Sequence, residues 1–230
     1  MANDQSLKDL YPFLHGRARD AAQIETVLLG SIAAKAADTR DVGARFFTEQ
    51  APVLLAAAKA LAGSYRAGGR LLAMGNGGSS CDAAHVVVEF QHPVTAGRPA
   101  LPAVNLTADV AMLSAVANDV GFEHVFVRQI VALGRPGDTL LGFSTSGNSA
   151  NLLAGFAKAK QLGLVTVGLA GGDGGAMRTG GAVDHCLVVP SRSIHRIQEC
   201  HVVAYHILWD LVHALLADDR GAAAVGDAGP

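Results

Sequence analysis

One stretch, residues 70–91, constrains the fold more than any other part of the chain; it reads RLLAMGNGGSSCDAAHVVVEFQ. It begins with a short apolar run, residues 71–74, which stops at a glycine and is typical of a buried strand in a parallel sheet. A glycine-rich turn follows, and Ser79, Ser80 and Asp82 are suitable N-capping residues for a helix after it. We therefore predict a strand, a tight turn and a helix N-terminus, whose free N–H groups and dipole attract anions.

The turn in this stretch matches neither of the two common nucleotide-binding loops. A dinucleotide fingerprint would need glycine at position 80, where the chain has Ser80, and a Walker A loop would need lysine followed by serine or threonine. We therefore expect no nucleotide cofactor. Two interpretations remain open: a plain turn before a capped helix, or a cradle for a phosphate group on a substrate.

A titratable pair lies deeper in the predicted helix. His85 and Glu89 are four residues apart, so they share one face of the helix. His85 alone could equally be a buried, hydrogen-bonded imidazole. Glu89 follows three consecutive valines, and a carboxylate in such a setting either lies at an exposed edge or has a function.

Composition excludes several classes of protein. The chain has 230 residues, half of them hydrophobic and only 17% charged, which predicts one ordered domain with a substantial core. A net charge of −2 gives no reason to expect a nucleic-acid partner. Three cysteines without CxxC spacing fit a reducing compartment, and we find neither a signal peptide nor a membrane span. We therefore expect a cytoplasmic protein.

The N-terminal part of the chain is predicted to be helical. Residues 21–37 carry an apolar stripe, residues 38–41 form a break with capping side chains, and an alanine-rich helix over 42–67 stops at two glycines. The expected organisation is a mobile N-terminal segment over 1–20, a single domain over 21–217 that includes these helices, and a disordered tail over 218–230.

The rest of the chain alternates strands with helices. We predict strands over 103–106, 139–143, 164–169 and 184–189, and helices up to 117 and over 123–133, 150–162 and 197–216. This order predicts an α/β fold with a parallel sheet. Ligands of such sheets bind beyond the carboxyl ends of the strands, and both special loops of the chain follow strands.

The second special loop is STSGNS, residues 144–149. It offers four hydroxyls and several N–H groups but no cation, which suits a phosphomonoester held by neutral donors and a helix dipole. A merely polar turn is the alternative, but a second loop of this kind in the same sheet makes a phosphate site the stronger interpretation.

The last predicted helix carries further polar side chains. Gln198 and His206 lie along one face at helical spacing, whereas His213 is interpreted as surface decoration. If this face meets His85 and Glu89, the four side chains would make a weak metal site or an acid/base pair.

Four ordered motifs then resemble one family. GNGGSSCDAAHVVVEF, AND with a GFE-like turn, STSGNSAN and RIQECHVVAYH are similar to the phosphoheptose isomerases of the sugar isomerase (SIS) domain class, over roughly residues 21–216. The resemblance implies a flavodoxin-like three-layer sandwich with a five-stranded parallel sheet. It also implies a homotetramer with active sites at subunit interfaces.

The resemblance also implies roles for individual residues. Glu89 and His206 match the acid/base pair, and zinc, bound by some members, would be held by His85, Glu89, Gln198 and His206. The matching phosphate and sugar positions are Asn76, Gly77, Gly78, Ser79, Asp119, Ser144, Thr145, Ser146, Ser149 and Gln198.

The implied reaction converts sedoheptulose 7-phosphate to D-glycero-D-manno-heptose 7-phosphate through an enediol, for heptose and lipopolysaccharide precursors. One departure bears on the substrate: Pro93 stands where the family commonly has an arginine. An isomerase for another sugar phosphate is therefore an alternative. A second is a non-catalytic replication-initiator-associating relative, which lacks the glutamate and the last histidine that this chain keeps. A sugar-sensing transcription regulator would need a helix-turn-helix domain, and the acidic, alanine-rich N-terminal helices do not resemble one.

Overall fold

A computed structural model of the chain describes residues 21–218. The predictions of a mobile segment over 1–20 and of a disordered tail therefore lie outside the described residues, apart from residue 218 at the end of the last helix. The chain divides into two compact units after Arg40, and each is described by itself. The limits of the functional domain stay a prediction.

Helix α2 spans Ala21–Arg66 without interruption, so the predicted break at residues 38–41 is wrong. That segment contains no glycine or proline, and the Thr39 hydroxyl donates to the carbonyl of Lys35 one turn earlier, a bond that leaves the helix continuous. The helix ends, as predicted, just before Gly68, which adopts a φ of 77°.

The predicted apolar stripe in the first unit faces outward. Ile24, Val27, Leu28 and Ile32 are between 41% and 65% exposed. In the described chain, this stripe is therefore available for contact with another molecule.

Five parallel strands form the sheet in the order β2-β1-β3-β4-β5, which confirms the predicted fold class. The strands are β1 (Leu71–Gly75), β2 (Ala103–Asn105), β3 (Thr139–Ser144), β4 (Val165–Gly171) and β5 (His185–Val189). The order changes direction between β1 and β3, so the loops after these two strands leave the sheet at its switch point.

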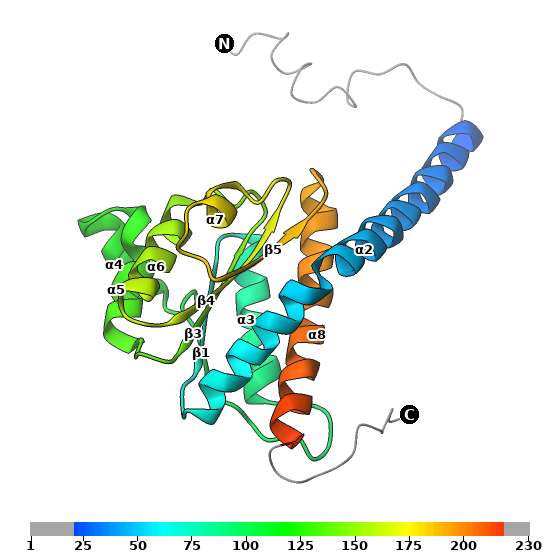
Figure 1. Cartoon of the computed structure of the whole chain (residues 1–230). Helices are drawn as coiled ribbons and strands as arrows, with labels where there is room; N and C mark the ends of the chain where they lie inside the picture. The colour runs from blue at the N-terminus through cyan, green and yellow to red at the C-terminus, as the bar shows by residue number, and fades with distance from the viewer. Residues whose placement is uncertain (1–20, 219–230) are drawn as a thin grey trace, which may run out of the picture. The chain divides into compact units, whose positions relative to one another are not determined.

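Helices cover both faces of the sheet and make three layers (Figure 1). Successive side chains of a strand point to opposite faces, so Leu71 and Ala73 join one buried cluster and Leu72 and Met74 the other. The first cluster includes residues of α2, α3 (Gly78–Gln91) and α8 (Ile194–Asp218). The second includes residues of α4 (Val110–Asp119), α5 (Val125–Leu133) and α6 (Ala150–Gln161).

Two local predictions differ from the structure. Helix α3 begins at Gly78 after Gly77, whose φ is 53°, and no side chain caps it, so the predicted capping by Ser79, Ser80 or Asp82 is wrong. The glycine backbone makes the turn by itself, which places these side chains within the first turn. A short helix, α7 (Gly175–Thr179), was not predicted and lies between β4 and β5, and a 3₁₀ turn, η2 (Phe122–His124), precedes α5.

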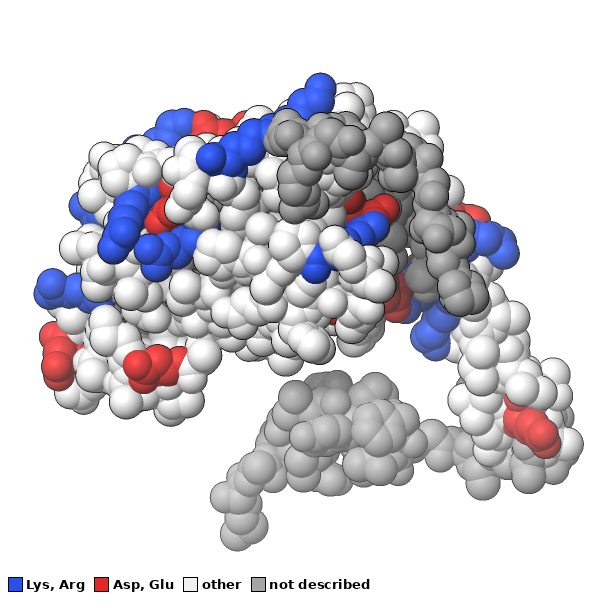
Figure 2. All heavy atoms as spheres, turned by 90° about the horizontal axis from the view of Figure 1, so that it is seen from below, with Lys and Arg blue, Asp and Glu red and all other residues white. Residues whose placement is uncertain are grey.

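Helix α8 has the length and hydropathy of a membrane span over Ile194–Ala217. However, Ile197, Ala204, Leu208 and Val212 of this helix are at most 2% exposed within the core of the sheet layers. Its apolar character is therefore that of a core helix. Figure 2 shows basic and acidic side chains interspersed on one face of the molecule, in keeping with the small net charge.

Candidate active site

Three titratable side chains from two helices meet beside the sheet. His85 and Glu89 come from α3, with His85 Nε2 and Glu89 Oε1 3.1 Å apart, and His206 comes from α8. One ligand atom from each of the three lies within 4.8 Å of the others. We call His85, Glu89 and His206 the trio; two imidazoles and a carboxylate at this spacing are a donor set that can hold a zinc-like ion.

The packing of α3 against α8 creates the trio. The Tyr205 hydroxyl reaches His85, and Trp209 Nε1 donates to the Glu89 carbonyl at 2.8 Å; both pairs are separated by 120 residues. This constant offset means that the helices run side by side in the same direction. His206 therefore comes level with His85, and their ring centroids are 5.1 Å apart.

Gln198, the fourth predicted metal ligand, lies on α8, two turns before His206. Its side chain contacts the N-terminus of α3. A Cβ atom at Gly78 would lie 2.3 Å from the Gln198 Nε2 atom, so this amide lies directly against the glycine. The structure thus places Gln198 against the glycine turn and brings the other three predicted ligands together.

The surroundings of the trio favour neutral His206. Burial lowers the pKa of His206, the charge of His85 lowers it further, and only Glu89 opposes these effects. A neutral imidazole can accept a proton or ligate a metal.

Asp82, one turn before His85 on α3, was not predicted as a site residue. It is 7% exposed, its Oδ2 has no hydrogen-bond partner among the described residues, and burial raises its pKa to about 6. The spacing of three residues from His85 was the available signal, since residues three apart share a helix face.

The two predicted phosphate loops meet at their helix N-termini. Asn76, in the turn after β1, and Asn151, in the first turn of α6, donate to each other at 2.8 and 2.9 Å. Asn151 is 2% exposed, so this pair is a buried bridge between the loops. Gly77 and Gly78 are exposed beside it, whereas the Ser79 side chain is buried.

The STSGNS loop presents hydroxyls and a helix N-terminus. Ser144 Oγ lies 3.0 Å from Ser149 Oγ and accepts from the Gly147 N–H at 3.2 Å. Ser146 is exposed and Thr145 half-buried, and α6 begins after Ser149 without a side-chain cap. An anion could therefore accept hydrogen bonds from both the hydroxyls and the first turn of the helix.

Asp119 lies apart from the trio. It is exposed at the end of α4, which packs on the opposite face of the sheet from α3 and α8, and its carboxylate accepts from the Asn118 amide at 2.8 Å. Within one chain, the structure therefore does not bring Asp119 to the trio.

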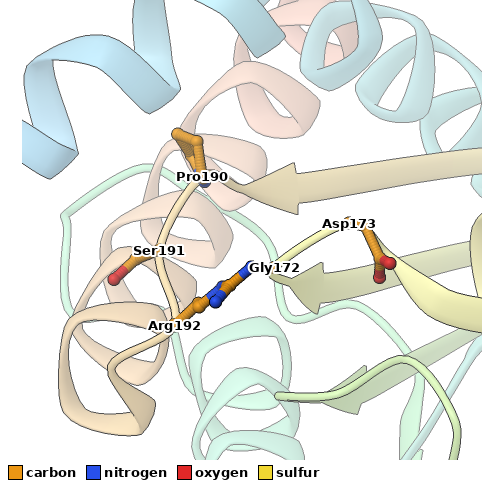
Figure 3. A pocket seen from close by; sticks show the side chains of 5 residues that line it. All are labelled: Gly172, Asp173, Pro190, Ser191 and Arg192. Carbon is orange, nitrogen blue, oxygen red and sulfur yellow. The ribbon is translucent and has the colours of Figure 1, made fainter.

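A hollow of about 500 Å³ opens at the carboxyl ends of β4 and β5. Its walls are Gly172, Asp173, Pro190, Ser191 and Arg192, and Figure 3 shows the Arg192 side chain reaching across toward Gly172. None of these five was predicted as a site residue, although their position after two strands of a parallel sheet was a usable signal.

The hollow lies next to the STSGNS loop. A side chain at Gly171 would meet Ile197 at 2.3 Å and the Thr145 carbonyl at 2.8 Å, so β4, the loop and α8 converge there. The hollow, the phosphate-type loop and Gln198 therefore occupy one edge of the sheet.

Comparisons with known proteins agree with this geometry. The family model described as the SIS domain matches residues 36–171, more than half of the chain. A phosphoheptose isomerase of Roseiflexus sp. is 43% identical over 182 residues, which cover 78% of this chain and 90% of the relative. One of Desulfovibrio desulfuricans is 44% identical over 197 residues, covering 85% and 92%.

Solved structures extend the likeness to three dimensions. A phosphoheptose isomerase from Francisella tularensis has a TM-score of 0.77 at 34% identity, covering 81% of this chain and 98% of that one. The enzyme from Neisseria gonorrhoeae has a TM-score of 0.76 at 35% identity, covering 81% and 99%. The chain therefore belongs to the phosphoheptose isomerases of the SIS domain family.

Proposed function

We propose that the chain isomerises sedoheptulose 7-phosphate to D-glycero-D-manno-heptose 7-phosphate for heptose synthesis. The observation that carries this proposal is the trio, which combines a carboxylate and two imidazoles in a chain that belongs to the phosphoheptose isomerases. Ketose–aldose isomerisation needs a base for a proton next to a carbonyl and an acid near the two oxygens, and these side chains are suited to both tasks.

Glu89 and His206 divide the proton transfers. Glu89 removes a proton from carbon 1 of the ketose, the electron pair forms the enediol, and a proton returns at carbon 2 of the aldose. His206 moves the proton between the two oxygens. Its lowered pKa keeps it neutral near pH 7, so it can accept a proton from one hydroxyl before it donates to the other oxygen.

The substrate phosphate binds at the STSGNS loop. The paired Ser144 and Ser149 hydroxyls, the exposed Ser146 and the uncapped start of α6 supply neutral donors for it. The Asn76–Asn151 bridge keeps this loop against the glycine turn, where Gly77, Gly78, Ser79 and Gln198 border the reacting end.

A divalent ion, with zinc as the best fit, would be held by His85, Glu89 and His206, and by Gln198 if its amide turns from Gly78 toward them. When bound, such an ion polarises a carbonyl oxygen. With the ion bound, His85 would be one of its ligands. Without the ion, Glu89 and His206 would still carry out the proton transfers.

The active form is a homotetramer with sites at subunit interfaces. Asp119 lies on the opposite face of the sheet from the trio, and the apolar stripe of residues 24–32 is exposed. Both features are explained if copies pack through their helices and one copy contributes Asp119 to the site of another. The free cysteines, Cys81, Cys186 and Cys200, are consistent with a reducing, cytoplasmic location.

Pro93 follows the C-terminal end of α3, whereas the cation at the carboxyl ends of the strands is Arg192. It lines the hollow on the same sheet edge as the phosphate-type loop and can bind a substrate hydroxyl or phosphate. This position favours a sugar phosphate long enough to extend from the trio into the hollow.

Incubation of the purified protein with sedoheptulose 7-phosphate, with and without a chelator, tests the proposal. Formation of the aldoheptose 7-phosphate is expected, with elemental analysis reporting zinc in the same preparation. No product from a folded, zinc-supplemented protein, together with turnover of another sugar phosphate, would reassign the substrate. Full activity in a preparation free of metal would exclude a role for zinc, and the proposed isomerase activity would stand.

A further inference from the structure

We propose that Tyr205 is a positioning residue for the trio. Its hydroxyl can either donate to His85 Nδ1 or accept from it. His85 can therefore take the tautomer that donates to Glu89 or the tautomer that binds a metal. Tyr205 directly precedes His206 in the RIQECHVVAYH motif and was not predicted as a site residue. The inference concerns the tautomer of one imidazole and rests on the proposed metal site only in its second half.

The Tyr205 ring packs against three other rings, two of which belong to the trio. It is 1% exposed, and its hydroxyl lies 2.5 Å from His85 Nδ1. Its ring packs edge-on against the His206 ring at 4.7 Å, the His85 ring at 5.3 Å and the Phe143 ring at 5.9 Å between centroids. This packing leaves the ring little freedom, so the hydroxyl is held at Nδ1.

The contacts of His85 define its tautomer when no metal is present. Nε2 lies 3.1 Å from Glu89 Oε1, and an ionised carboxylate can only accept, so Nε2 of a neutral His85 must carry the proton. Nδ1 is then an acceptor, and the Tyr205 hydroxyl must donate to it.

A metal on Nε2 requires the opposite arrangement. The proton then resides on Nδ1, which has to donate, and metal-bound histidines depend on a partner for that second N–H. A hydroxyl can reverse its role because it is both donor and acceptor, whereas a carbonyl, a carboxylate or a phenyl ring cannot. Tyr205 therefore supports both forms of His85 without any movement of its ring.

The test combines a spectroscopic readout with a metal affinity, so neither depends on turnover. Magic-angle-spinning NMR of protein labelled with ¹⁵N-histidine, at about pH 8.5 where ordinary histidines are neutral, reports which ring nitrogen is protonated. The His85 signals are assigned by their loss in His85→Gln. Zinc affinity is measured by competition with a chromogenic chelator for the wild type and for Tyr205→Phe.

Tyr65→Phe is the matched control. Tyr65 is also a largely buried tyrosine of the same layer, in contact with Phe90, but its hydroxyl has no hydrogen-bond partner among the described residues. Both variants lose one buried hydroxyl, and only Tyr205→Phe loses the contact with His85.

We expect the metal-free wild type to show the Nε2–H form of His85 and the zinc-loaded protein the Nδ1–H form. Tyr205→Phe should lose about 10- to 100-fold in zinc affinity, and Tyr65→Phe less than twofold. A metal-free Nδ1–H form, or zinc affinity in Tyr205→Phe within twofold of the wild type, would overturn the inference. A wild type that binds no zinc would overturn the metal half even if isomerase activity, measured separately, were normal.

Discussion

Asn76 and Asn151 exchange two amide hydrogen bonds, at 2.8 and 2.9 Å, between the glycine turn after β1 and the first turn of α6. Each amide donates one N–H to the other and accepts one in return. The pair thereby fixes the distance between the two loops that end at the switch point of the sheet. The proposed substrate site, which uses both loops, depends on this distance.

Replacement of Asn151 by alanine should therefore reduce both stability and substrate binding. The change leaves the Asn76 amide unpaired, and we expect a loss of about 1–3 kcal/mol in the free energy of unfolding, with a raised KM. Gln161→Ala, which removes an exposed amide at the end of α6, should change stability by less than about 0.5 kcal/mol. Denaturant unfolding and steady-state kinetics check both, and equal effects of the two substitutions would show that the bridge has no special role.

Removal of either member of the proposed acid/base pair should abolish most of the activity. Glu89→Gln and His206→Ala are each expected to lower turnover by ~10²-fold or more, because each removes a proton-transfer group from the reaction. Glu49→Gln, on the exposed side of α2, and His185→Ala, at the amino end of β5, are the controls and should keep wild-type turnover. Near-normal turnover in folded Glu89→Gln and His206→Ala would exclude both residues from the mechanism.

Loss of hydroxyls from the STSGNS loop should weaken phosphate binding. Combining Ser144→Ala with Ser149→Ala removes two neighbouring donors, at ~1 kcal/mol for each hydrogen bond lost, so KM should rise about tenfold or more. Thr48→Ala removes an exposed hydroxyl on α2 and serves as the control. An unchanged KM, or equal activity on unphosphorylated sedoheptulose, would show that the phosphate binds elsewhere.

His201 should make the fold sensitive to acid. It is fully buried, its Nε2 lies 3.3 Å from the Ala170 carbonyl, and burial lowers its pKa from 6.5 to about 4. Between these values the unfolded chain binds more protons than the folded chain, so stability is complete above about pH 6.5 and falls as the pH drops toward 4. Between pH 7 and pH 5 the wild type should lose about 2 kcal/mol more than His201→Gln in denaturant unfolding. Parallel pH profiles for the two proteins would contradict this assignment.

Much of the architecture could be predicted because its signals are local. Buried strands such as β1 and β3 are continuous apolar runs that end at glycine or serine, and the order of strands and helices specifies a parallel sheet. Each special loop follows a strand of a parallel sheet, so the sheet edge that carries the hydroxyls could also be predicted. These features depend on short windows of sequence, where hydrophobic patterning is most informative.

The site was less predictable because it depends on packing between distant segments. The packing of the sheet and the core determines which residues of α3 lie beside which residues of α8. The spacing of residues within either helix gives no information about this. The same cause explains His213, which was interpreted as surface decoration but is 2% exposed, stacked near Phe90 and edge-on to Trp209. Helix α8 packs against both the sheet and its neighbouring helices, so its buried face is wider than an isolated amphipathic helix would suggest.

In the proposed mechanism Glu89 transfers a proton between adjacent carbons of a sugar phosphate, while His206 moves a proton between the two oxygens. Incubation of the protein with sedoheptulose 7-phosphate in D₂O, followed by ¹H and ¹³C NMR, tests it most directly. We expect an aldoheptose 7-phosphate with deuterium at carbon 2, formed by the wild type and nearly absent with Glu89→Gln. Product formed at the wild-type rate by Glu89→Gln, or no aldoheptose from the folded wild type, would contradict it.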